Sequence, residues 1–163
     1  MADYIEHRLK IENILKNQKE TDFDILEGMI ILAYRGSIAH GTYIPNSDPN
    51  SVDDIDVVGI TIPPSEYFFG LSNFEQVEIK EDCYDIIIYD IRKAVRLLLK
   101  ANPNILSVLW TEPELYIYKT ELGDRIIKQR DIFSSTMVYH SFLGYVDSQL
   151  KKMTAFSTEG YMG

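Results

Sequence analysis

The sequence predicts an α+β domain with a mixed central β-sheet flanked by helices and with a helical extension at the C-terminal end. Segments typical of strands gather in the first half of the chain, whereas helical patterns dominate the second half. The 163 residues, of which 45% are hydrophobic and 25% charged, suffice to bury a core without disulfide or metal staples. We therefore expect one folded domain, or one domain and the beginning of another.

The chain opens with a pattern for a helix, followed by a buried strand. In residues 3–18 apolar side chains recur near helical spacing, which predicts an amphipathic helix. Residues 29–34 form a continuous apolar run that stops at Arg35-Gly36-Ser37, and such a run is typical of a strand buried on both faces. Residues 41–54 are rich in Pro, Asn, Ser and Asp, so they predict a loop.

Three further segments predict strands. Residues 55–62 are β-branched and apolar, and they end at Pro63-Pro64. Residues 74–80 and 83–89 are two more candidates, and residues 80–82 are the expected turn between them. Together with residues 29–34, these segments supply the strands of the expected sheet.

Helices are expected in most of the remaining chain. Asp90 is placed to cap a helix over residues 91–99, and the Asn-Pro-Asn of residues 102–104 starts another that runs to Trp110. Residues 121–130 and 136–153 predict the last two, the second capped by Ser134 or Ser135. We expect a first domain over residues 1–115 and a helical extension over residues 116–163, which could be the start of a truncated C-terminal region.

Composition restricts the classes of function. Asp and Glu outnumber Lys and Arg by 25 to 16, for a formal net charge of −9, which argues against an extended track for a nucleic-acid backbone. Cys83 is the only cysteine, so an intrachain disulfide is impossible and a reducing compartment is expected. The sequence contains neither a signal-peptide pattern nor an apolar run of membrane-spanning length, so we expect a cytoplasmic protein with no membrane partner.

Small and acidic residues with chemical potential follow the predicted strands. Gly36 lets backbone N–H groups approach a phosphate closely, and Ser37 adds a hydroxyl donor. Asp54 and Asp56 lie two residues apart on a predicted strand, so both carboxylates should project from one face. Neighbouring like charges repel, and a cation between them makes the placement favourable. Mg²⁺ is the natural candidate, because it takes few carboxylates and retains waters and phosphate oxygens.

A third carboxylate on a neighbouring strand would complete a site for two metal ions. Asp85 and Asp90 both lie in the last predicted strand region. Asp85 stands inside the apolar strand, where an unpaired charge is costly, whereas a helix cap explains Asp90 at ordinary cost. Asp85 is therefore the better candidate for a ligand.

These motifs resemble those of the DNA polymerase beta-like nucleotidyltransferase superfamily: Gly36-Ser37 after an apolar strand, then Asp54-Ile55-Asp56-Val57, then a strand acid. The wider runs over residues 36–42, 54–60, 85–89 and 102–104 are similar to a bacterial and phage branch associated with RNA repair. The similarity extends from about residue 29 to the C-terminus. Two features depart from the pattern: residues 38–53 make a longer spacing than usual, with the surplus over residues 46–51, and His40 stands where an aromatic residue such as Tyr is expected.

The resemblance implies a nucleotidyltransferase fold and a two-metal transfer of a nucleoside monophosphate from a nucleoside triphosphate to a hydroxyl acceptor, with release of pyrophosphate. It implies that Gly36 and Ser37 hold phosphates. It also implies that Asp54, Asp56 and Asp85 bind two Mg²⁺ ions, for which Mn²⁺ could substitute, and that an RNA end is the favoured acceptor.

Other interpretations stay open at this point. Arg35 could contact a phosphate, or it could be a strand-edge charge. His40 could contact the nucleotide or the acceptor, or it could be an ordinary polar loop residue. The chain could instead be a nucleotide-binding regulatory or adaptor module without turnover, or an enzyme that transfers AMP to protein side chains.

Overall fold

The computed structural model describes residues 2–45, 48 and 54–159. Expectations for the surplus loop over residues 46–51, apart from Asp48, and for the tail over residues 160–163 therefore lie outside the described residues. None of the helices in the described part combines the length and the apolar character that crossing a membrane requires.

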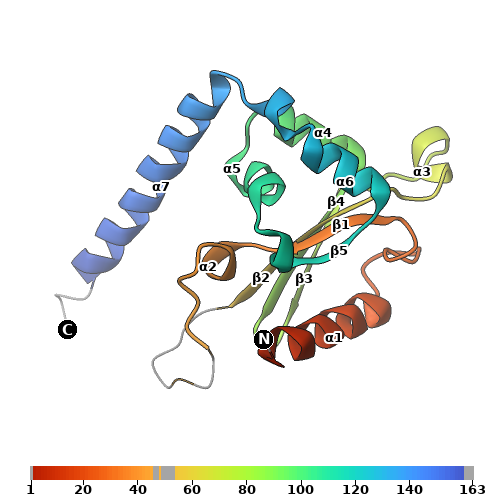
Figure 1. Cartoon of the computed structure of the whole chain (residues 1–163), viewed down its shortest axis with the longest axis horizontal. Coiled ribbons are helices and arrows are strands. Elements are labelled where there is room, and N and C mark those ends of the chain that lie inside the picture. The colour runs from red at the N-terminus through yellow and green to blue at the C-terminus, as the bar shows by residue number, and fades with distance from the viewer. Residues whose placement is uncertain (1, 46–47, 49–53, 160–163) are drawn as a thin grey trace.

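The described chain is an α+β fold, as the sequence predicts, with a five-stranded mixed sheet flanked by helices (Figure 1). The sheet has the order β3-β4-β2-β1-β5. Its strands are β1 (Met29–Tyr34), β2 (Ile55–Thr61), β3 (Gln76–Glu81), β4 (Tyr84–Asp90) and β5 (Tyr116–Lys119). The helices are α1 (Ala2–Asn17), α2 (Gly36–Ala39), α3 (Glu66–Phe69), α4 (Ile91–Leu99), α5 (Pro103–Leu106), α6 (Glu121–Lys128) and α7 (Met137–Glu159). Short 3₁₀ helices are η1 (Ser107–Trp110), η2 (Pro113–Leu115) and η3 (Arg130–Phe133).

Strand direction decides which residues become neighbours. β2 and β4 are parallel, whereas β1 runs antiparallel to β2 and to β5, and β3 runs antiparallel to β4. β1 and β2 both lie inside the sheet, and β1 is buried on both faces, as its continuous apolar run predicts. β2 is buried except at Asp56, which is partly exposed. The end of β1 therefore lies beside the beginning of β2, and the beginning of β2 lies beside the beginning of β4.

Each face of the sheet packs against its own set of helices. On one face α1 contributes Ile11, Ile14 and Leu15 to a cluster that includes alternate residues of β2 and β4. On the other face α4, α5 and η1 cover Val58 and Ile60 of β2. α7 contacts α5 and then runs away from the sheet (Figure 1).

Several sequence expectations change in the structure. β3 and β4 join through the two-residue turn Asp82-Cys83, with Asp82 in the left-handed region at φ 52°, and not through residues 80–82. Leu9, one of the apolar side chains that recur near helical spacing in residues 3–18, is 64% exposed and is not part of the buried face of α1. β5 lacks a strong strand pattern but pairs with β1, so the sheet runs past the expected boundary after residue 115.

Asp90 is the N-cap of α4, as predicted. Its side chain is 1% exposed and accepts a hydrogen bond from the Arg92 backbone N–H, and a second from Arg92 Nε at 2.9 Å. Arg92 Nη1 also donates to the Tyr67 carbonyl, which ties α4 to the α3 segment. The buried carboxylate is therefore fully used in holding the start of the helix.

Asp90→Ala is expected to lower the free energy of unfolding by about 3 kcal/mol, because it removes both a helix cap and a charge-assisted hydrogen bond. Asp90→Asn keeps an oxygen for the cap and should cost about half as much. Urea denaturation of the two variants measures the difference. Equal, small losses in both variants would contradict a structural role for this carboxylate.

Candidate active site at the beginning of β2 and β4

The site begins where β1 ends. Arg35 continues the antiparallel pairing of β1 with β2, since its backbone N–H donates to the Asp56 carbonyl at 3.0 Å. The chain then turns sharply into α2, and Gly36 adopts φ +60°, in the left-handed region that glycine tolerates best. Ile38, 4% exposed, anchors the turn in the core below.

The α2 turn is closed by its own backbone. The His40 N–H donates to the Gly36 carbonyl at 3.1 Å, and the Thr42 N–H donates to the Ser37 carbonyl at 2.9 Å. Gly36 and Ser37 are thus held at the edge of the sheet by a compact hydrogen-bonded loop, as the strand-to-Gly-Ser pattern predicts.

Asp56 and Asp85 are direct neighbours across the parallel pair of β2 and β4. Residues in register on adjacent strands point to the same face, and the strands lie about 4.8 Å apart. Both side chains keep a quarter of their surface exposed, 28% for Asp56 and 23% for Asp85. The structure therefore brings together two of the three predicted metal ligands on one accessible face.

Gly36 packs directly on the Asp56 carboxylate. A Cβ atom added at residue 36 would lie 2.1 Å from Asp56 Oδ2, which is shorter than any real contact. The close approach requires glycine for a second reason besides the positive φ. The turn at Gly36 and the acidic pair of Asp56 and Asp85 are therefore parts of one site.

Asp54 lies one residue before β2, not within it, and its side chain is exposed. Alternation from Asp56 places it on the same side of an extended chain. As the side chains stand, no three His, Cys, Asp or Glu residues within 2–45, 48 and 54–159 lie in a group that could hold a metal ion. The role of Asp54 as the third ligand stays a prediction. Asp53, which precedes it, lies outside the described residues.

Each acid of the pair has a cationic neighbour. Arg35 Nη2 donates to Asp56 Oδ1 at 3.1 Å, and Lys80 Nζ lies 3.5 Å from Asp85 Oδ2. Arg35 is 17% exposed, and its Nε has no hydrogen-bond partner within the part of the chain that the structure describes. Arg35 thus lies at the acidic pair with one buried donor unused, and its contact with a phosphate stays a prediction.

Lys80 and Tyr89 are features that the sequence analysis missed. Lys80 faces Asp85 across the β3–β4 hairpin. A prediction of the two-residue turn Asp82-Cys83 would have placed these two residues opposite each other. Burial raises the pKa of the Tyr89 phenol above its ordinary value of 10, with Glu78 contributing, while the positive charge of Arg35 opposes the rise. Tyr89 is therefore a neutral hydroxyl within the electrostatic reach of Arg35.

The donor set of this site suits a hard divalent cation. Carboxylate oxygens are the ligands that Mg²⁺ takes in proteins, and it accepts few of them while retaining waters and phosphate oxygens. Asp56 and Asp85 offer partly exposed oxygens from adjacent strands, and the backbone of Gly36 packs against the Asp56 carboxylate. The donor atoms of Asp56 and Asp85 are thus of the kind that Mg²⁺ would require, and the binding of this ion stays a prediction.

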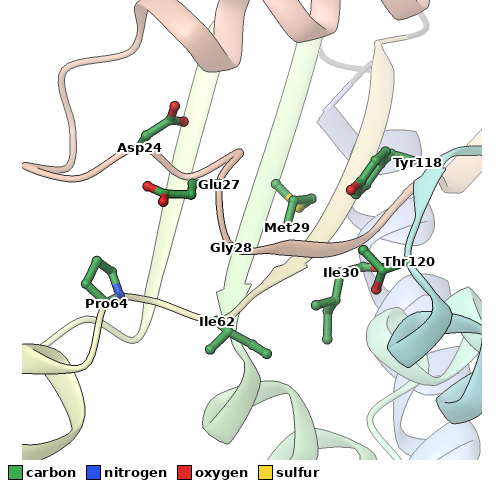
Figure 2. A pocket seen from close by; sticks show the side chains of 9 residues that line it. All are labelled: Asp24, Glu27, Gly28, Met29, Ile30, Ile62, Pro64, Tyr118 and Thr120. Atoms are coloured by element: carbon green, nitrogen blue, oxygen red, sulfur yellow. The ribbon is translucent and has the colours of Figure 1, made fainter.

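A hollow of about 430 Å³ lies away from the candidate site, at the beginning of β1 and the end of β2 (Figure 2). Asp24 and Glu27 line one side of it, and Tyr118 lies across from them (Figure 2). Asp24 Oδ1 accepts a hydrogen bond from the Leu26 N–H, so this carboxylate orders its own loop. Gly28 at the floor packs against the Ile62 carbonyl. None of the predicted site residues lines this hollow.

Comparison with known families adds one finding. The model of the RlaP family, described as the RNA repair pathway DNA polymerase beta family, matches residues 8–161. The match spans the α2 turn, the acidic pair and α7. The comparison with curated proteins gave no match.

Proposed function

The chain belongs to the RNA repair pathway DNA polymerase beta family, and from this premise we propose that it is a metal-dependent nucleotidyltransferase. It transfers a nucleoside monophosphate from a nucleoside triphosphate to a hydroxyl acceptor, with an RNA end favoured. The observation that carries the proposal is the in-register pair Asp56 and Asp85, packed against the glycine turn at Gly36.

The proposed roles follow from position. Gly36 and Ser37 bind the β- and γ-phosphates, because a partly exposed glycine turn and a small hydroxyl follow the end of β1. Asp54 and Asp56 would hold both ions, and Asp85 would hold the ion on the acceptor side. Two divalent ions, Mg²⁺ or in its place Mn²⁺, would stabilise the attacking and leaving oxygens of an in-line displacement.

The proposed transfer forms one bond to phosphorus and breaks another. The acceptor oxygen forms a bond to the α-phosphorus, while the bond from that phosphorus to the bridging oxygen of the β-phosphate breaks and pyrophosphate leaves. Asp85 is the proposed acceptor for the hydroxyl proton, since it is the accessible carboxylate farther from Gly36 along the sheet. Arg35, whose guanidinium donates to Asp56, would contact a phosphate oxygen of the bound triphosphate.

The direct test is a transfer assay with the whole chain. The four nucleoside triphosphates, labelled at the α-phosphate, are incubated with Mg²⁺ and with total RNA or total protein as acceptors, and EDTA is the control. Label on RNA 3′ ends is expected. Label on protein would move the proposal to protein modification, and nucleotide binding without any transferred label would favour a regulatory or adaptor module.

A thermal-shift measurement tests Asp54 as a metal ligand. At a concentration one hundred times its dissociation constant, ATP with Mg²⁺ should stabilise the wild type by about 2.7 kcal/mol, which corresponds to a rise of roughly 5–10 °C in melting temperature. Asp54→Asn should melt like the wild type without ligand, because the side chain is exposed, and should lose the ATP-dependent rise. A rise of equal size in both proteins would remove Asp54 from the metal site.

A further inference from the structure

A hollow of about 440 Å³ opens directly beyond the α2 turn, where α5, η1 and α7 meet. Its volume is in the range of sites for small organic ligands. Its lining includes Ala39, His40, Leu106, Trp110, Val138 and Phe142. The α2 turn, which carries Gly36 and Ser37, therefore forms one wall of this mostly apolar hollow.

Two aromatic rings in this hollow remain open to solvent. Trp110 is 41% exposed and Phe142 is 38% exposed, although Leu106 beside them is buried. The guanidinium of Arg130 lies 5.3 Å from the centroid of the Trp110 ring, and Arg130 Nη1 also donates to the Leu109 carbonyl. Trp110 is therefore held in place and still offers ring surface to a ligand.

Hydroxyl groups supply polar contacts at the edge of the hollow. Ser107 Oγ donates to the Asn104 carbonyl at 3.2 Å, and Thr111 Oγ1 donates to the Ser107 carbonyl at 3.3 Å. A hydroxyl that donates within the protein keeps lone pairs with which to accept a hydrogen bond from a ligand. A flat ring that carries an amino group matches both the aromatic surface and these acceptors.

We propose that this hollow binds a nucleobase by stacking it on Trp110. The inference rests on the proposed function, because it is the phosphates bound at Gly36 and Ser37 that would bring a nucleoside to the adjoining wall at Ala39 and His40. Base–aromatic stacking tolerates different bases, since each base presents a π face. The base belongs either to the nucleoside triphosphate or to the terminal nucleotide of an RNA acceptor, and titration separates these sources.

Trp110 is the only tryptophan of the chain, so its fluorescence reports this hollow alone. In the presence of Mg²⁺, ATP should quench the emission, whereas inorganic tripolyphosphate should bind without quenching it. Quenching by ATP assigns the hollow to the base of the triphosphate. Quenching only by a short single-stranded RNA, with none by ATP, assigns it to the acceptor.

Variants give a second measurement that does not use activity. Calorimetry should show that Trp110→Leu weakens the binding of the quenching ligand about 5- to 150-fold, while the affinity for tripolyphosphate stays within twofold of wild type. Trp110→Phe keeps an aromatic face and should recover most of the lost affinity. Tyr139→Leu is the matched control, because Tyr139 is a 67% exposed aromatic that does not line the hollow.

The outcomes separate this proposal from the one on which it rests. If ATP and RNA bind to the wild type without changing Trp110 emission, and Trp110→Leu binds them equally well, the stacking site is overturned while the nucleotidyltransferase stands. If replacing Asp56 leaves the binding of ATP and of tripolyphosphate unchanged, or if neither ligand binds to the wild type, the proposed function fails. The nucleobase site, which rests on it, then fails as well.

Discussion

Replacing Asp56 by asparagine is expected to reduce nucleotidyl transfer at least about a thousandfold, a loss of about 4 kcal/mol of transition-state stabilisation. The carboxylate lies next to Asp85 on the adjacent strand and against Gly36, so its charge is the centre of the proposed cation site. Initial rates with labelled ATP and Mg²⁺ measure the loss.

Asparagine is the sharper replacement here because it preserves the fold. Arg35 Nη2 donates to Asp56 Oδ1, and an amide oxygen at residue 56 can still accept this hydrogen bond. Asp147→Asn is the control, since Asp147 is 61% exposed on α7 and forms a surface ion pair with Lys151. Transfer by the residue-56 variant at more than a tenth of the wild-type rate would mean that this carboxylate does not hold the catalytic cations.

Gly36→Ala is the second change with a large expected effect. The new Cβ would lie 2.1 Å from Asp56 Oδ2, so the carboxylate must move, and a displacement of about 1 Å at a catalytic group can cost about a hundredfold in rate. The positive φ adds a backbone cost of about 1 kcal/mol. We expect transfer to fall about a hundredfold or more and Mn²⁺ affinity to fall with it.

Gly41→Ala separates the two causes. Gly41 has φ +69°, close to the φ of Gly36, but a Cβ there would meet nothing within 4 Å. It should therefore lose about 1 kcal/mol of stability and keep its activity. Denaturation curves and initial rates on both variants make the comparison. Equal losses of activity would attribute the effect of Gly36→Ala to backbone strain and not to contact with Asp56.

The parts of the fold that the sequence predicted well are those with strong local patterns. The continuous apolar run of β1, the largely apolar segment of β2 and the cap residue Asp90 each leave a signal within a few positions. α2 and β5 were missed because each spans four residues, too few for a helical or alternating pattern to show. The β3–β4 turn was misplaced because Lys80 and Glu81 look polar enough for a loop, although they continue the edge strand.

The sequence names the residues of the candidate site and expects its acids on neighbouring strands, but it does not say which strands pair or in what register. Sequence order places Asp56 and Asp85 on strands, but only the parallel pairing of β2 with β4 makes them neighbours. The contact between Gly36 and Asp56 depends on the end of β1 lying beside the beginning of β2. No local sequence pattern marks Trp110 as a binding residue, because its surroundings come from α2, η1 and α7, which are far apart along the chain.

The central claim concerns the carboxylates around one cation site, and a crystal structure with Mn²⁺ and a non-hydrolysable ATP analogue tests it most directly. Anomalous scattering locates Mn²⁺ independently of the protein density. We expect peaks within about 2.3 Å of carboxylate oxygens of Asp54, Asp56 and Asp85, with the triphosphate against Gly36 and Ser37. Bound nucleotide and Mn²⁺ at another place on the molecule, with these three side chains unliganded, would contradict the account.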